Sequence, residues 1–217
     1  MTLLVTAHVA QSLDGRLSFV GNAASLSTIE GRRSAHQARA DNDAVLVGIE
    51  TIRIDNPELT VRHVEGADPL RVIATRTLAK VPRDARALDR DRRSKAKTLI
   101  VTVDDAAPAP AFGDNVEIVR VSPAEDGMVD LHATLRVLEE RGIARLLVEG
   151  GARILTSFLH QRLLHRLEIE IAMCMLGSPN LSIFGALGVS AIERAPKLDN
   201  VTIERLGANL LVRGDVI

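Results

Sequence analysis

Short runs of apolar and β-branched residues recur along the whole chain, and they restrict the possible folds more than any other feature. Several runs are continuous rather than alternating, which is typical of strands covered on both faces. The predicted strands are residues 3–9, 44–47, 70–74, 98–103, 116–121, 145–148, 167–172, 200–206 and 209–216. The last two are joined by a short turn, Gly207-Ala208-Asn209, which predicts an antiparallel hairpin at the end of the sheet.

Helical patterns separate many of these strands. Ser27-Thr28-Ile29-Glu30 has the pattern of a capping box and predicts a helix start. Asp130 is a suitable N-cap, and Gly142 stands where a left-handed residue would end a helix. The predicted helices run from this capping box to about residue 40, over 131–141 and over 152–164.

The alternation of strands and helices indicates an α/β fold with a mostly parallel sheet. The expected hairpin makes that sheet mixed. Because no internal repeat or linker interrupts the pattern, we expect residues 1–217 to form a single domain.

The composition excludes several classes of protein. A formal net charge of −1 argues against a nucleic-acid binder that neutralises many phosphates. The single cysteine, Cys174, leaves no partner for an internal disulfide and no thiolate set for zinc. The N-terminal residues lack a signal-peptide pattern, and no apolar stretch approaches membrane-spanning length. We therefore expect a cytoplasmic protein with no metal, no membrane partner and no nucleic-acid partner.

A pair of glycines follows one of the predicted buried strands and opens a predicted helix. Without a Cβ at Gly150 and Gly151, backbone amides at the helix N-terminus can approach and bind a phosphate. Glu149, the last residue of the strand, would face the crevice where open α/β sheets bind ligands. A three-glycine dinucleotide fingerprint is absent, so a plain strand-to-helix turn with no ligand remains an alternative.

Three further segments have simple readings when each is taken alone. Asn56-Pro57 indicates a turn, which Asp55 would cap, and Ser12-Leu13-Asp14-Gly15-Arg16 indicates a turn after the first strand. The segment 83–97 carries seven Lys or Arg against three Asp. We interpret it as a solvated loop with a helical turn rather than as a binding patch.

Taken together, the segments 12–16, 47–62 and 147–151 resemble the pyrimidine reductase family of riboflavin biosynthesis. That family, the C-terminal reductase domain of the bifunctional deaminase-reductase, typically shows S-L-D-G-[KR], then V-G-x-x-T-[VI]-x-x-D-[ND]-P-x-L-T-x-R, then L-[VL]-E-G-G. All three patterns occur here in that order, and residues 36–40 match the family's helix before the second pattern. The resemblance covers essentially the whole chain and implies a dihydrofolate-reductase-like fold.

The resemblance implies NADPH-dependent reduction of 5-amino-6-(5-phosphoribosylamino)uracil, in which the ribosyl side chain becomes a ribityl chain. Glu149 and Asp55 would be the catalytic carboxyl groups. The implied cofactor-binding residues are Ala10, Thr51, Asp55, Thr75, Arg76, Gly150, Gly151, Ala152, Arg153, Ile154 and Leu155. The implied substrate-binding residues are Ser25, Arg39, Leu59, Arg62 and Glu149.

Two arginines suit a dianionic 5′-phosphate, because each offers a planar fork of donors. We therefore expect Arg39 and Arg62 to bind that phosphate. Arg76 and Thr75 follow a predicted strand where no acidic residue stands, which favours NADPH over NADH. Members of the family are commonly dimeric, so a homodimer is expected.

The chain departs from the family pattern at several positions. His8 stands where the family carries Lys or Asn, Leu26 follows Ser25 where a bulkier residue is usual, and Met173-Cys174-Met175 replaces a segment with Pro and Lys. These departures keep two alternatives open: a dihydrofolate-reductase-like or other NADPH-dependent small-molecule reductase, and a catalytically silent nucleotide-binding protein. No deaminase domain is expected, because one cysteine cannot complete that domain's zinc site.

Overall fold

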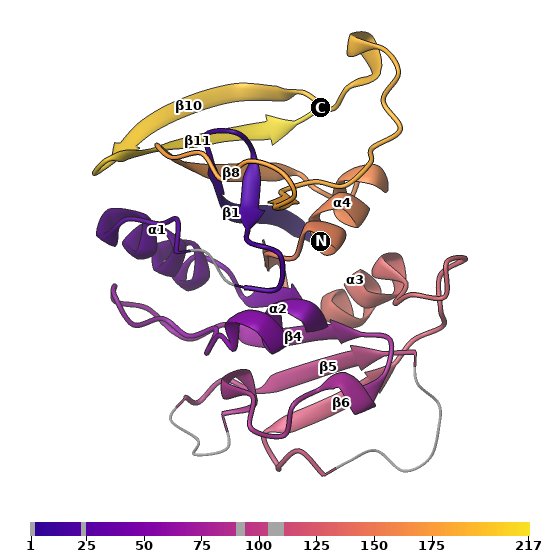
Figure 1. Cartoon of the computed structure of the whole chain (residues 1–217). Coiled ribbons are helices and arrows are strands. Elements are labelled where there is room, and N and C mark those ends of the chain that lie inside the picture. The colour runs from indigo at the N-terminus through magenta and orange to yellow at the C-terminus, as the bar shows by residue number, and fades with distance from the viewer. Residues whose placement is uncertain (1–2, 23–24, 90–93, 104–110) are drawn as a thin grey trace.

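A nine-stranded sheet organises the described part of the chain, in the order β10-β11-β8-β1-β7-β3-β4-β5-β6 (Figure 1). The computed structural model describes residues 3–22, 25–89, 94–103 and 111–217. The strands are β1 Leu4–Ser12, β3 Ala44–Gly48, β4 Leu70–Thr75, β5 Thr98–Thr102, β6 Val116–Arg120, β7 Arg145–Glu149, β8 Arg166–Ala172, β10 Leu198–Leu206 and β11 Asn209–Val216. Every predicted strand is present, with ends shifted by at most three residues.

The sheet is mixed, as predicted. From β8 to β6 every neighbouring pair is parallel, whereas β11 runs antiparallel to both β8 and β10. The β10–β11 hairpin closes on Leu206 and Asn209, which form the last pair of its ladder. Two short strands, β2 Arg16–Ser18 and β9 Leu181–Ser182, form a separate antiparallel ribbon. These strands were not predicted, because two or three residues are too few to show an alternating pattern.

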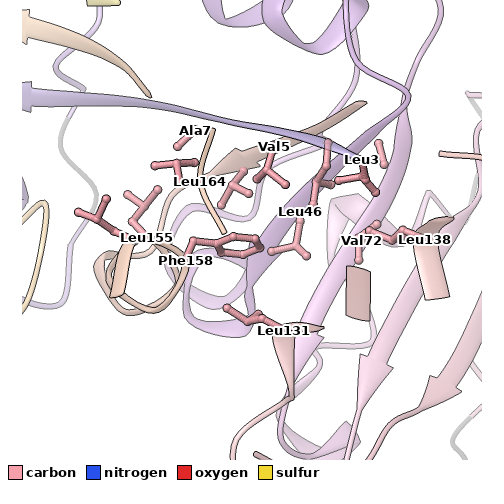
Figure 2. Packing of buried hydrophobic residues seen from close by; sticks show 14 of the residues in the cluster. Leu3, Val5, Ala7, Leu46, Val72, Leu131, Leu138, Leu155, Phe158 and Leu164 are labelled. Atoms are coloured by element: carbon pink, nitrogen blue, oxygen red, sulfur yellow. The ribbon is translucent and has the colours of Figure 1, made fainter. Parts of the chain in front are cut away.

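Helices pack on both faces of the sheet, and each face has its own apolar core. On one face α3 (Leu131–Glu140) and α4 (Ala152–His160) contribute Leu138 and Phe158 to a cluster with Val5 and Leu46 (Figure 2). On the opposite face α2 (Ile49–Asp55) contributes Ile52, which packs with residues of β3, β4 and β5. Three short 3₁₀ turns complete the described elements: η1 Leu78–Lys80, η2 Arg86–Leu88 and η3 Ile192–Arg194.

The expected capping box at Ser27 is wrong by one residue. Helix α1 (Ile29–Ala40) takes Thr28 as its N-cap, and the Thr28 hydroxyl accepts from the Gly31 amide at 3.0 Å. Gly31 therefore occupies the position where a capping box needs Glu or Gln. The reciprocal bond comes from Glu170 in β8, whose Oε1 accepts from the Thr28 amide at 3.1 Å. A residue distant in sequence thus replaces the local partner that the pattern assigned to Glu30.

The ends of the other helices differ less from expectation. Asp130 caps α3 by accepting from the Ala133 amide, as predicted, and Gly142 has a φ of 76°. Helix α4 stops at His160 rather than near residue 164, because Arg162 adopts a left-handed φ of 56° and Leu163 donates back to the Phe158 carbonyl. The apolar spacing continues past this stop, which explains the overestimate.

Helix α2 was not predicted. Its seven residues begin directly after β3, and this is too short for a helical period to stand out. Residues 83–89 of the basic segment contain the helical turn η2, and residues 90–93 lie outside the described part of the chain. No helix among the described residues is long and apolar enough to cross a membrane.

Candidate functional site

The carboxyl ends of the central parallel strands form one edge of the sheet, and chain order reverses there. From β1 the chain crosses to β3 and continues outward to β6. It then returns to insert β7 between β1 and β3, and β8 follows on the far side of β1. Such a reversal leaves a crevice beyond the strand ends, the usual ligand site of an open α/β sheet. Glu149 ends β7 at this edge.

The turn after Glu149 is built from two left-handed glycines. Gly150 and Gly151 have φ values of 75° and 84°, which residues with a Cβ rarely adopt. Gly151 is the N-cap of α4, and within the described chain no side chain caps the first amides of that helix. These amides are therefore left to a ligand or to solvent.

Helix α2 places Thr51 beside this turn. A Cβ added to Gly151 would lie 3.3 Å from Thr51 Oγ1, and one added to Gly150 would lie 3.7 Å from it. Asp55 follows Thr51 by one helical turn and so shares its face of α2. Desolvation raises the pKa of the exposed Asp55 carboxyl above its ordinary value. The structure thus brings together four of the residues predicted for the cofactor: Thr51, Asp55, Gly150 and Gly151.

The positions 56–62, here called the strap, run from the end of α2 across this region. Asn56 ends α2 in the left-handed region with a φ of 42°, and Leu59 adopts a φ of 56°. The Leu59 side chain is fully buried in the core cluster beneath the strap. Only the backbone of Leu59 can therefore face a substrate.

Arg39 and Glu149 form a largely buried ion pair at the centre of the site. Arg39 Nε and Nη2 donate to the two carboxylate oxygens of Glu149, each at 2.7 Å, and the side chains are 12% and 14% exposed. Arg39 Nη1 donates to the Thr60 carbonyl at 3.0 Å. Burial alone would lower the pKa of Arg39, but the neighbouring Glu149 carboxylate raises it, so the guanidinium stays charged. The planar fork of Arg39 is thus occupied by protein groups.

Arg62 lies on the other side of Thr60 and is more open. Its Nη1 donates to Thr60 Oγ1 at 2.7 Å and also to the carboxylate of Glu58. Its backbone amide donates to His36 Nδ1 at 2.9 Å. Arg39 and Arg62 therefore contact the same strap, but only Arg62 has its guanidinium open to solvent.

His36 is a buried residue that holds the strap, and sequence reasoning assigned it no role. Its ring packs edge-on against His63 with centroids 4.5 Å apart. Burial is the largest cause that lowers the pKa of His36 to about 4, and the charges of Arg39 and Arg62 lower it further. Its place one helical turn before Arg39, inside the matched 36–40 segment, was the available signal.

The depressed pKa of His36 predicts a pH-dependent stability. The stability that neutral His36 provides is fully present above the unfolded-state pKa of 6.5 and is lost as the pH falls toward 4. Protonation at Nδ1 would also remove the acceptor for the Arg62 amide. Allowing for partial screening, we expect the unfolding free energy to fall by about 2 kcal/mol over this range. Urea denaturation at a series of pH values measures it.

The control for this prediction is His36→Asn, which keeps a side-chain acceptor near Nδ1 but does not titrate. Its unfolding free energy should lack this part of the pH dependence. An unchanged pH slope in His36→Asn would assign the effect to other groups.

The remaining predicted residues lie along the same edge at greater distance. Ala10 sits near the end of β1, the neighbour of β7, whereas Thr75 ends β4, which β3 separates from β7. The Thr75 hydroxyl donates to the Thr77 carbonyl at 2.8 Å and so stabilises its own turn. Arg76 is exposed, and its guanidinium has no ion-pair partner among the described residues. Ser25 is exposed just before α1.

His8, noted as a departure, has a partner in the next strand. Its register pairs it with Glu149 on β7 and with Glu168 on β8, so the three side chains share one face of the sheet. His8 Nδ1 lies 3.2 Å from Glu168 Oε2. Burial opposes ionisation of Glu168, but the contact with His8 and the charges of nearby arginines lower its pKa.

The Ser12–Arg16 turn has a structural role. Asp14 accepts from the Leu176 and Gly177 amides at 3.1 and 2.7 Å and from the Ser12 hydroxyl at 2.5 Å. These bonds, that of Ser12 first, lower the pKa of Asp14 to about 2. They hold the segment after β8, which includes the altered Met173–Met175 residues, against the end of β1. Across the described ranges, no three His, Cys, Asp or Glu side chains converge as metal ligands.

The sheet order and its polar edge define a protein of the dihydrofolate-reductase-like class. A dihydrofolate reductase from Enterococcus faecalis, solved with NADP(H), superposes with a TM-score of 0.52 at 9% identity over 98% of this chain and 96% of its own. The chain belongs to the RibD C-terminal domain family, whose profile matches residues 4–212. The predicted fold and family are therefore confirmed.

Individual relatives extend this assignment. The chain is 34% identical over 210 residues to the riboflavin biosynthesis protein RibD of Aquifex aeolicus, covering 96% of this chain but 56% of that protein. It is 34% identical over 193 residues to the 2,5-diamino-6-ribosylamino-4(3H)-pyrimidinone 5′-phosphate reductase of the same organism, covering 84% and 82%. A solved Thermotoga maritima deaminase/5-amino-6-(5-phosphoribosylamino)uracil reductase superposes with a TM-score of 0.81 at 27% identity, over 100% of this chain and 57% of that one. The chain thus spans little more than half of its longer relatives.

Proposed function

We propose that this chain reduces 5-amino-6-(5-phosphoribosylamino)uracil with NADPH, converting its ribosyl side chain to a ribityl chain. The observation that carries the proposal is the run Glu149-Gly150-Gly151, in which an Arg39-bound carboxylate directly precedes an uncapped helix start. A substrate group and a nucleotide phosphate would thus lie side by side at the end of β7. Family membership and the names of the relatives support the reaction class.

The residues at the turn fit a dinucleotide. A Cβ at Gly151 would enter the space beside Thr51, so the glycine keeps a cradle open for a pyrophosphate. We assign its binding to the backbone amides of Gly150, Gly151 and the first turn of α4: Ala152, Arg153 and Ile154. Leu155, which the resemblance also implied, donates its amide to the Gly151 carbonyl at 3.1 Å and buries its side chain, so we assign it to the helix start rather than to the phosphate. Thr51, Asp55 and the backbone of Ala10 complete the proposed cofactor site.

When bound, NADPH supplies the hydride. The side chains of the protein orient the substrate and supply the proton. The nitrogen of the reduced imine needs a proton. Asp55, whose pKa is raised by desolvation, is suited to relay one, whereas both carboxylate oxygens of Glu149 accept hydrogen bonds from Arg39. We therefore assign the proton to Asp55 and substrate orientation to Glu149. Ser25, Arg62 and the Leu59 backbone complete the proposed substrate site.

The function is tested by following NADPH oxidation with three substrates side by side. They are the phosphoribosylaminouracil, the 2,5-diamino-pyrimidinone phosphate for which several relatives are named, and dihydrofolate. We expect turnover with a phosphorylated pyrimidine and none with dihydrofolate. Faster turnover of dihydrofolate would favour the alternative reductase, and NADPH binding without oxidation of any substrate would favour a silent nucleotide-binding protein.

Gly151→Ala is expected to weaken NADPH binding about tenfold or more, the loss of one hydrogen bond to a charged group. The new Cβ would crowd Thr51 Oγ1 and block the approach of a phosphate. Calorimetric titration with NADPH measures the change. Gly142→Ala is the matched control, because Gly142 has a similar φ of 76° with nothing within 4 Å of its Cβ position. Equal affinities in the two variants would place the pyrophosphate elsewhere.

Arg76 provides the proposed preference for NADPH over NADH. The guanidinium of Arg76, which follows β4 and pairs with no acidic side chain of the described residues, can bind a 2′-phosphate through charge-assisted bonds. We expect Arg76→Ala to weaken NADPH and to leave NADH nearly unchanged, with a difference that shrinks as salt rises. Parallel titrations with both nucleotides measure this. Equal weakening of the two would remove Arg76 from the 2′-phosphate site.

We also propose that the protein forms a homodimer. Strand β10 is a sheet edge, and seven consecutive residues along it are exposed. Val201 and Ile203 are among the exposed apolar residues there. An uncovered edge strand that exposes apolar side chains favours association with another chain. Sedimentation equilibrium measures the mass, and a monomer at micromolar concentration would refute the dimer.

A further inference from the structure

The strap gathers three guanidinium groups, and they differ in how far each is already engaged. Arg39 is nearly buried, and its guanidinium group donates hydrogen bonds to Glu149 and to the Thr60 carbonyl. Arg62 and Arg86 are 43% and 54% exposed, and both donate to the carboxylate of Glu58. Two open guanidinium groups therefore converge on a single carboxylate at the rim of the site.

The backbone fixes Arg86 in this position. Its amide donates to Asn56 Oδ1 at 2.8 Å, and Asn56 is the first residue of the strap. The neighbours Ala85, Ala87 and Leu88 are buried, so the η2 turn is anchored in the core while the Arg86 side chain projects outward. This anchoring does not depend on the ion pair with Glu58.

The charges of this cluster suit a dianion. Hydrogen bonding by Arg86, followed by the charge of Arg62, lowers the pKa of Glu58 although burial opposes this, so Glu58 is ionised. One carboxylate cannot neutralise two guanidinium groups. A phosphate dianion offers more oxygens to the same two forks and can replace Glu58 between them.

We propose that Arg86 is a further substrate-binding residue, which binds the 5′-phosphate of the substrate together with Arg62. Glu58 orients the two side chains and is exchanged for the phosphate when substrate binds. This inference rests on the proposed function. It differs from the sequence-based expectation, which paired Arg62 with Arg39 and treated the segment around Arg86 as solvated. Arg39 instead holds Glu149 and the strap.

The test measures phosphate binding apart from catalysis. Ribose 5-phosphate and ribose are titrated calorimetrically into the parent, Arg86→Ala and Arg83→Ala. Arg83 is an exposed arginine three residues away that donates to the Ala111 carbonyl and lies over the Phe112 ring, so its loss is a matched charge control. The Arg86→Ala change keeps the amide that bonds Asn56, so the variant should fold as the parent does.

We expect Arg86→Ala to bind ribose 5-phosphate about tenfold more weakly or worse, and Arg83→Ala to bind it as the parent does. With the pyrimidine substrate, KM should rise and NADPH affinity should stay unchanged. Equal affinities in Arg86→Ala and Arg83→Ala, or no binding of ribose 5-phosphate by the parent, would overturn the inference. A phosphate site that depends on Arg86 in a protein without pyrimidine turnover would refute the proposed function alone. Turnover that is unchanged in Arg86→Ala would refute the Arg86 inference alone.

Discussion

Arg39→Ala is expected to lower the unfolding free energy by about 3 kcal/mol and kcat/KM by about a hundredfold or more. The substitution removes both bonds to Glu149 and leaves that carboxylate without its counter-ion in a site only 14% exposed. It also removes the donor to the Thr60 carbonyl, so the strap loses one of its two ties to α1, the other being the bond from the Arg62 amide to His36. Urea denaturation measures the first effect, and initial rates with the phosphorylated pyrimidine measure the second.

Two control variants distinguish the loss of the Arg39–Glu149 ion pair from the loss of an arginine at the surface. Arg39→Lys should recover little, because an ammonium group cannot reproduce the two parallel bonds of the guanidinium fork. Arg53→Ala, which removes an exposed arginine paired with Glu50 on α2, should change stability by less than about 0.5 kcal/mol. A loss in Arg39→Ala no larger than that in Arg53→Ala would show that the pair contributes nothing beyond surface charge.

The strands could be predicted from the sequence because the residues of each strand themselves show its apolar pattern. A buried parallel strand such as β3 or β5 needs a continuous apolar run whatever its neighbours are. The order of the strands in the sheet has no such local pattern. The insertion of β7 between β1 and β3 depends on contacts between segments 141 and 102 residues apart, and only the family resemblance implied it.

The candidate site shows the same division. The motifs associated Thr51, Asp55 and the Gly150-Gly151 turn because each motif keeps its own spacing, and the fold places Thr51 beside that turn. They could not reveal that the fork of Arg39 is taken by Glu149, because that pair joins positions 110 residues apart. Arg86 lies outside every motif, so only the folded chain connects it with the strap.

The prediction of the N-cap of α1 was wrong for a related reason. A capping box is a local pattern, but the bond it assigned to Glu30 is made by Glu170, 142 positions from Thr28. The carboxyl of Glu170 is fully buried against the first turn of α1, where Gly31 leaves room for it. This close approach explains a glycine inside a helix, where glycine is otherwise unfavourable.

Gly31→Ala is therefore expected to destabilise the protein by about 3 kcal/mol, although alanine in place of glycine normally stabilises a helix by about 1 kcal/mol. The new Cβ would overlap the Glu170 carboxylate. Glu170 Oε1 accepts from the Thr28 amide at 3.1 Å and from Asn209 Nδ2 at 2.6 Å, so its displacement leaves two donors unsatisfied. Urea denaturation of the variant measures the loss.

A double-mutant cycle with Glu170→Ala shows whether the overlap is the cause. Glu170→Ala should itself destabilise the protein, because it removes the acceptor shared by Thr28 and Asn209. It also empties the space beside Gly31, so Gly31→Ala in that background should be neutral or stabilising by up to about 1 kcal/mol. The coupling energy between the two positions should then reach about 3 kcal/mol or more. If the two losses simply added, the glycine would be required for some reason other than the approach of Glu170.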